Sequence, residues 1–218
     1  FVGFESDTVC FGDETTLTDT SNSSNPILTQ EWDLDNDGLF DDDTGKVIKF
    51  ISTVADTFVV GLKVTTATAS DSTYDTVIVY PLPMADFSFT SSCQGAPTMF
   101  TAMSSYSGPG SIAKHYWDYD NDTLNDDSGS TVNFQFNIAG TYKTRMIVET
   151  SLGCTNDTIK NVKVNQMPNA DFSYSNTCVG DSVLFQNISS IGPPDSIINY
   201  HWTYGDGYDA IIKGHHMH

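Results

Sequence analysis

Short runs in which apolar and polar residues alternate recur along the chain, and no stretch has the 3.6-residue spacing of an amphipathic helix. Val, Ile, Thr, Phe and Tyr dominate these runs, and Gly, Pro, Asp and Ser bound them. The clearest runs cover residues 15–18, 46–51, 57–64, 76–80, 131–136, 142–149 and 158–164. Alternation with a period of two places one face of a β-strand against a core and the other face in solvent. The pattern therefore predicts an all-β protein.

One tryptophan recurs at a fixed interval. Trp32, Trp117 and Trp202 are separated by 85 residues each time (117 − 32 and 202 − 117). A repeat of this length that holds about seven short strands is typical of tandem immunoglobulin-like β-sandwiches. We expect each tryptophan to lie on a strand that crosses the core. The alternative, an exposed aromatic residue that binds a ligand, fits less well because the tryptophans keep the register of the strand pattern.

Two proline-containing junctions, at residues 81–83 and 167–169, divide the repeats. The predicted domains are residues 1–83, 84–168 and 169–213. The third repeat ends after its acidic turn and lacks the last three strands, so either the chain was cut there or another chain completes the sheet. Residues 214–218 read G-H-H-M-H, which favours a tag remnant over a histidine metal site.

Three short motifs resemble those of the PKD (polycystic kidney disease-like) domain family. Residues 202–207, W-T-Y-G-D-G, resemble the family's W-x-F-G-D-G signature, and residues 32–38, W-D-L-D-N-D-G, resemble its acidic variant. Residues 140–142, G-T-Y, resemble the family's G-x-Y strand and stand where a tyrosine corner is expected, whereas Phe58 takes that place in the first repeat. The resemblance implies tandem PKD-type β-sandwiches with a non-catalytic role in spacing, adhesion or the presentation of a catalytic module.

The cysteine motifs extend this resemblance. The C-x-G-D openings at residues 10–13 and 178–181, with a Gly-Cys pair at 153–154, are similar to those of repeat arrays in large secreted proteins of gliding and surface-colonising Bacteroidota. The resemblance thus implies an extracellular or cell-surface, adhesin-like array.

The turn after each of the first two tryptophans is rich in aspartate. Asp33, Asp35 and Asp37 alternate and Gly38 takes the sixth place, as in the first half of a calcium loop. Calcium takes six to eight oxygen ligands, and carboxylates this close would repel one another without a cation. The predicted Ca²⁺ ligands are Asp33, Asp35, Asp37, the Leu39 carbonyl and Asp41 or Asp42 in the first repeat, and Asp118, Asp120, Asp122, the Leu124 carbonyl and Asp126 or Asp127 in the second.

These turns depart from a complete EF-hand. The twelfth place holds Thr44 or Gly129 instead of glutamate, and Thr123 replaces the glycine of the second turn. The alternative is an Asp/Asn-rich turn whose side chains cap main-chain amides. The third repeat retains only Asp206 and Asp209, and no comparable site is predicted there.

Four cysteines indicate an oxidising compartment if they pair. Cys93 opens the second repeat and Cys154 precedes its last strand, so the predicted disulfide is Cys93–Cys154, worth ~4 kcal/mol. Moving Cys154 back by one repeat reaches Ala69, so Cys10 has no partner in its own repeat, and Cys178 would pair beyond the end of the chain. The alternative is four buried free thiols.

The charge balance limits which classes of binding partner the protein can have. Nine basic residues face 28 acidic ones, giving a net charge of −19. Such a surface repels nucleic acid and anionic lipid, and suits calcium or a cationic surface, although acidity also serves solubility alone. The sequence has no run of 18 apolar residues, so no membrane-inserted helix is predicted, and no signal peptide is visible.

Catalytic motifs are missing from the sequence. It contains no G-x-S-x-G, no H-E-x-x-H, no phosphate loop and no Cys/His pair. The crowded aspartates do not offer the two separated carboxyl groups of a glycosidase. We therefore predict a non-catalytic, calcium-stabilised extracellular spacer or adhesion array. Its expected partners are neighbouring repeats, a polysaccharide or a surface protein. The alternatives are an accessory module that positions substrate for a secreted protease or glycoside hydrolase, or a self-assembling filament subunit.

Overall fold

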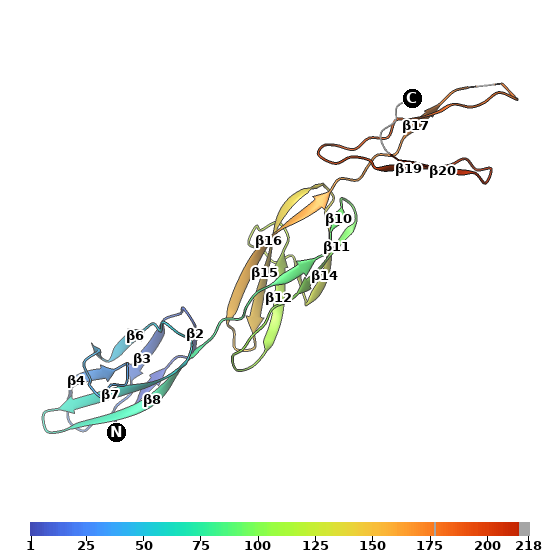
Figure 1. Ribbon diagram of the computed structural model, residues 1–218. Helices are drawn as coiled ribbons and strands as arrows, with labels where there is room; N and C mark the ends of the chain where they lie inside the picture. Colours follow the sequence, from blue (N-terminus) through green and yellow to red (C-terminus); the bar gives the residue numbers. More distant parts are fainter. Residues whose placement is uncertain (177, 214–218) are drawn as a thin grey trace.

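The computed structural model describes residues 1–176 and 178–213, and in these residues the regular structure consists of strands β1 to β20. The strands form three units that follow one another along an extended path (Figure 1). The expectation of an all-β protein built from immunoglobulin-like sandwiches is confirmed. Within the described residues no helix is long and apolar enough to cross a membrane. The predicted tag remnant at residues 214–218 lies outside the described residues.

The first unit is a sandwich of two sheets. One sheet has three strands in the order β1 (Phe4–Ser6), β3 (Thr15–Asp19), β6 (Val47–Phe50). The other has five strands in the order β2 (Val9–Cys10), β8 (Ser70–Tyr80), β7 (Thr57–Thr66), β4 (Ile27–Asp33), β5 (Asp43–Thr44). Alternate residues of β7, namely Val60, Leu62 and Val64, enter the core, as the period of two predicts.

The second unit repeats this architecture. Its three-stranded sheet has the order β14 (Thr131–Gln135), β11 (Pro97–Ala102), β9 (Phe87–Phe89). Its five-stranded sheet has the order β10 (Ser92–Cys93), β16 (Thr155–Asn165), β15 (Gly140–Thr150), β12 (Ile112–Asp118), β13 (Asp127–Ser128). The hairpin of β15 and β16 is the largest single element and supplies the core residues Met146, Val148, Val162 and Val164.

The third unit consists of two short ribbons. One pairs β17 (Phe172–Tyr174) with β18 (Phe185–Asn187), and the other pairs β19 (Asn199–Thr203) with β20 (Asp209–Lys213). Among the described residues, no strands take the places that β15 and β16 occupy in the second unit. The aromatic side chains between the two ribbons are therefore only partly covered.

Two of the three tryptophans are interior, as predicted. The side chains of Trp32 and Trp117 are fully buried, and each indole N–H donates to a main-chain carbonyl, of Gly45 and Gly129 respectively, at 2.9 Å. These bonds satisfy the one polar group that burial would otherwise leave unpaired. Trp202 is half-buried, because its unit lacks the covering strands.

The predicted tyrosine corner is present in the second unit. The Tyr142 hydroxyl donates to the carbonyl of Ile138 at 2.8 Å, and its ring packs on Phe136 with centroids 4.2 Å apart. In the first unit Phe58 packs on Phe50 with centroids 5.6 Å apart. Aromatic packing is thus common to both units, whereas the hydroxyl contact belongs to the second.

The predicted Cys93–Cys154 disulfide is wrong. Cys154 is bonded to Cys10 of the first unit, with 5.5 Å between the Cα atoms, and Cys93 is a free thiol. The reason is the direction of β16: Cys154 precedes its first residue, whereas Cys93 is in register with Asn165 at its other end. Eleven extended residues span about 35 Å, far beyond the reach of a disulfide. Cys178 is an exposed free thiol.

Short parallel strands explain why Cys10 reaches the second unit. Strand β2 pairs with the end of β8, which places Cys10 opposite Tyr80, the residue before the first junction. The turn that carries Cys154 faces the same junction, where the Asn156 side chain donates to the carbonyl of Pro83 at 2.8 Å. Figure 1 shows β2 at the end of the first unit that faces the second. The disulfide therefore links two consecutive sandwiches across their junction.

Candidate metal centres in the acidic turns

The two acidic turns begin with a buried carboxylate at the end of a core strand. Asp33 ends β4 and Asp118 ends β12, and their side chains are 0% and 1% exposed. Asp33 accepts main-chain N–H groups of Asp37 at 3.2 Å and Gly38 at 3.0 Å. A buried carboxylate needs such donors, and it fixes the loop that supplies them.

The second turn has the same hydrogen bonds and the same backbone shape. Asp118 accepts from Asp122 at 3.2 Å and from Thr123 at 3.0 Å. The fourth residue after each of the two tryptophans is left-handed, with φ of 58° at Asn36 and 59° at Asn121. The sixth is left-handed too, with φ of 89° at Gly38 and 79° at Thr123. Thr123 adopts the glycine conformation although it is β-branched, which strains the second turn.

Each turn brings three carboxylates to within 4.8 Å of one another. In the first turn these are Asp33, Asp35 and Asp37. In the second they are Asp118, Asp120 and Asp126. One of three in each group is buried and two are exposed, so each group combines a fixed oxygen with two that face solvent. Such all-oxygen groups suit hard divalent cations, and Ca²⁺ in particular because its ligand geometry is flexible.

The remaining predicted ligands lie around these groups. Asp42 and Asp126 are structural equivalents, because their N–H groups donate to the carbonyls of Trp32 and Trp117. Asp126 belongs to the carboxylate group of its turn, whereas the Asp42 carboxylate accepts the N–H of Leu34 at 2.6 Å and stays outside the compact group. The first turn is one residue longer, which shifts this position.

The other predicted positions fall outside the compact groups. Asp122 accepts the N–H of Leu124 at 2.8 Å, and Asp127 accepts the hydroxyl of Tyr119 at 3.4 Å. The carboxylates of Asp41, Asp42, Asp122 and Asp127 are not members of the compact groups, and the carbonyls of Leu39 and Leu124 stay predicted ligands. Capping of main-chain amides, the alternative to a cation site, accounts for several of these carboxylates.

Desolvation and the charges of neighbouring carboxylates both raise the pKa of the central aspartate of each turn. Partial desolvation, followed by the neighbouring Asp37 and Asp42 charges, raises the pKa of Asp35. Desolvation, followed by Asp122 and Asp126, raises the pKa of Asp120. A raised pKa means that the folded turn disfavours the ionised carboxylate, and a bound cation would reverse that preference.

Sequence reasoning missed one neighbour of the first turn. The Tyr74 hydroxyl lies 3.5 Å from an Asp33 carboxylate oxygen, and desolvation together with the Asp33 charge raises the pKa of Tyr74. Tyr74 comes from β8, 41 residues away in the chain. No local motif marks it, since the contact depends on the pairing of Tyr74 with Gly61 of β7. The second turn has Ile159 one repeat after this position.

A family model described as "PKD domain" matches residues 81–164, which span the second unit. This match supports PKD-type domains, which occur in extracellular proteins and are typically non-catalytic spacer or adhesion modules. None of the curated proteins matches the sequence.

Solved structures of similar architecture include isolated PKD domains and multi-domain arrays. The PKD1 domain of Vibrio anguillarum Epp is 22% identical over 39% of this chain and 96% of its own, with a TM-score of 0.34. The PKD1 domain of the Vibrio cholerae metalloprotease PrtV is 24% identical over 38% and 98%, with a TM-score of 0.33. Three N-terminal domains of the outer capsid protein Hoc of bacteriophage RB49 are 14% identical over 97% and 78%, with a TM-score of 0.41.

Proposed function

We propose that this chain is a non-catalytic extracellular spacer in which calcium stiffens each sandwich and a disulfide fixes one sandwich to the next. The Cys10–Cys154 bond carries the proposal, because it joins two separately folded units and so serves their spacing. A link of this kind favours an oxidising, extracellular setting. Neighbouring repeats are then the first partners of each unit, and a polysaccharide or another surface protein is the expected target of the array.

Calcium has a definite part in this proposal. The compact carboxylate groups of the first two units occupy the same turn of the fold, and the net charge of −19 gives cations a strong general attraction. Binding would oppose the desolvation and the charge repulsion that raise the pKa values of Asp35 and Asp120. It would also tie the turn to the buried carboxylate beneath it, which stiffens the end of each sandwich.

The test of calcium is thermal unfolding of the oxidised protein with EDTA and with millimolar CaCl₂. We expect Ca²⁺ to raise the Tm. The corresponding increase in the free energy of unfolding is about 3 kcal/mol when the Ca²⁺ concentration is 100 times Kd. Asp35→Ala combined with Asp120→Ala should abolish that rise. The matched control, Asp206→Ala combined with Asp209→Ala, removes the same charge from the third turn and should keep the rise. An unchanged Tm in millimolar Ca²⁺ would refute the calcium site.

The spacer itself is tested by small-angle X-ray scattering on oxidised and reduced protein. The oxidised chain should give a narrow distribution of interatomic distances, and reduction should broaden it without unfolding either sandwich. Identical distributions would show that the disulfide does not set the spacing, whatever the result with calcium.

A further inference from the structure

We propose that the first unit binds a small aromatic amine, that is, an aromatic ring with an ammonium group attached, in a cavity beside its acidic turn. Such a site is separate from the spacer function and does not require calcium. Three features of the molecule support it. They are a cavity with two aromatic walls, the rings that fill the same place in the second unit, and the Asp35 carboxylate in the lining.

The cavity has a volume of about 580 Å³ and is lined by the acidic turn, the end of β6 and the start of β7. The rings of Phe50 and Phe58 in its walls are nearly perpendicular, with centroids 5.6 Å apart and an interplanar angle of 72°. The other apolar side chains of the lining are Leu34, Ile51 and Val59. Cavities of this size that combine apolar walls with a few polar groups are typical of small-molecule sites.

The second unit has a ring where the first unit has Leu34. Leu34 and Tyr119 are equivalent, because each follows the aspartate that ends the strand of the tryptophan. Phe50 and Phe134 are equivalent too, because each is in register with a buried threonine of the neighbouring strand. Tyr119 stacks on Phe134 with centroids 4.0 Å apart and an interplanar angle of 19°. Phe50 therefore lacks the stacking partner that its counterpart has.

A second ring is replaced in the same way. Ser52 and Phe136 are both buried, and each lies two residues after the phenylalanine that pairs with the threonine. Phe136 packs on Tyr142 with centroids 4.2 Å apart, whereas Ser52 has no ring to offer Phe58, the counterpart of Tyr142. The cavity is thus the space that two missing aromatic side chains leave in an otherwise equivalent sandwich.

The missing rings define the shape of the ligand. A planar aromatic ring can stack on Phe50 or pack against Phe58, as two rings of the chain itself do in the second unit. The same ring would cover the apolar side chains of Ile51 and Val59, which are exposed in the lining. An aliphatic ligand would cover these side chains but would not restore the stacked contact.

Asp35 defines the charge of the ligand. Among the described residues that line the cavity, Asp35 is the only ionisable one. The carboxylates of Asp33 and Asp37 offer oxygens within 4.8 Å of its own, and the whole chain carries a net charge of −19. A cation is attracted to this place and an anion is repelled from it. An ammonium group on the ring therefore fits, and a carboxylate does not.

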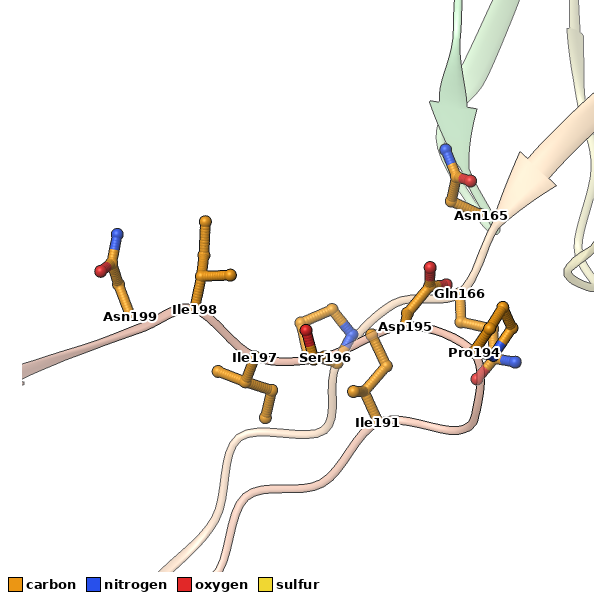
Figure 2. A pocket seen from close by; sticks show the side chains of 10 residues that line it. Asn165, Gln166, Ile191, Pro194, Asp195, Ser196, Ile197, Ile198 and Asn199 are labelled. Carbon is orange, nitrogen blue, oxygen red and sulfur yellow. The ribbon is translucent and has the colours of Figure 1, made fainter. Parts of the chain in front are cut away.

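A second cavity of similar size shows that volume and charge do not suffice. It has a volume of about 530 Å³ and lies at the second junction, between Asn165 and the loop that carries Pro194 (Figure 2). Its described lining includes the charged residue Asp195 but no aromatic side chain. A ring has nothing to stack on there, so the aromatic amine is assigned to the first unit.

The test is an NMR titration of the oxidised full chain, isotope-labelled at phenylalanine, with phenethylamine as the probe. The ring signals of Phe50 and Phe58 report the site, so that binding elsewhere in the chain is not counted. EDTA keeps Ca²⁺ away from Asp35, which makes the outcome independent of the calcium proposal. We expect saturable shifts of both rings with a Kd on the order of 1 mM, as is usual for so small a ligand.

Two other probes separate the ring from the charge. Phenylacetate keeps the ring and reverses the charge, and butylamine keeps the charge and lacks the ring. Each should bind at least about tenfold more weakly than phenethylamine, since each loses one of the two interactions.

Three variants locate the site. Leu34→Tyr with Ser52→Phe supplies the two rings of the second unit and should abolish the shifts. Asp35→Asn should weaken phenethylamine binding roughly fivefold and remove most of its advantage over phenylacetate. Asp120→Asn makes the same change in the second unit and should have no effect, and this pair of variants decides the matter even if the ring-filled protein does not fold. Absence of saturable shifts, equal binding of phenylacetate, or an unchanged affinity in Asp35→Asn would overturn the proposal.

Discussion

Replacing both cysteines of the interdomain disulfide, Cys10→Ser with Cys154→Ser, should destabilise both of the first two units. The bond does not close a loop inside either sandwich, so its effect depends on which unit unfolds. With the first unit folded, Cys10 is held beside Tyr80. Unfolding of the second unit then leaves a closed loop of about 74 residues (154 − 80). Restriction of a loop of that size corresponds to about 4 kcal/mol at 25 °C in the chain-entropy model.

The first unit gains a similar amount. With the second unit folded, the turn that carries Cys154 is held at the junction by the bond from Asn156 to Pro83. Unfolding of the first unit then closes a loop of about 73 residues (83 − 10), which again corresponds to about 4 kcal/mol. For domains of roughly 80 residues this is a Tm decrease of roughly 16–32 °C for each unit.

Differential scanning calorimetry of the oxidised protein and the double variant measures this decrease. Cys93→Ser with Cys178→Ser is the matched control, since both thiols are free in the structure. We expect the control to unfold like the parent protein. If the Cys10/Cys154 variant unfolds at the same temperature as the control, the linkage between the two units is wrong. If only one transition moves, the reasoning that couples both units through the junction is wrong.

Three further predictions concern single residues. Thr123→Gly should raise the free energy of unfolding by roughly 0.5–1 kcal/mol in urea titration, because relief of left-handed strain outweighs the entropy of glycine; a loss of stability would contradict the strain. Tyr142→Phe should cost about 1 kcal/mol in the same assay, since it removes the bond to the Ile138 carbonyl, and an unchanged midpoint would refute a stabilising corner. The hydrogen bond from Lys160 holds the pKa of Asp86 below its usual value of 3.8, so this pair stabilises the fold above that pH and the stability is lost as the pH falls through the lowered pKa. Lys160→Met should therefore lower stability at neutral pH and flatten its decline in acid, and parallel curves for the two proteins would refute the link.

The fold was predictable where it depends on local patterns. The spacing of Trp32 and Trp117 and the alternation along residues 57–64 and 142–149 identified core strands, because burial of one strand face leaves a period of two in the sequence. The Gly-Thr-Tyr motif located the contact of Tyr142 for the same local reason. These signals do not need knowledge of which strands become neighbours.

The cysteine pairing depends on neighbours that the sequence does not reveal. Strands β2 and β10 have two residues each, too short to show any period. Their parallel pairing with β8 and β16 places Cys10 and Cys93 at the junction ends of their units. The paired strands are far apart in the sequence, so no local pattern predicts this pairing. That Cys93 and Cys154 belong to the same repeat therefore did not mean that they are close in space.

The acidic turns also combine a feature that the local sequence predicts with features that it does not. The alternating aspartates at 33, 35 and 37 come together as their spacing indicates. In the second turn the carboxylate of Asp126 takes the third place in the group instead of Asp122. The two turns differ by one residue in length and in the conformation that Thr123 must adopt, and spacing alone does not convey either effect.

The bond between Cys10 and Cys154 also determines how the chain responds to pulling at its ends. Tension that enters at the N-terminus crosses from Cys10 directly to Cys154 and leaves along β16, so the intervening backbone carries no load while the sulfurs stay joined. That bypassed segment spans a sequence separation of 144 residues and holds about 490 Å of contour length. Reduction would release it, and this segment could then lengthen the protein by unravelling.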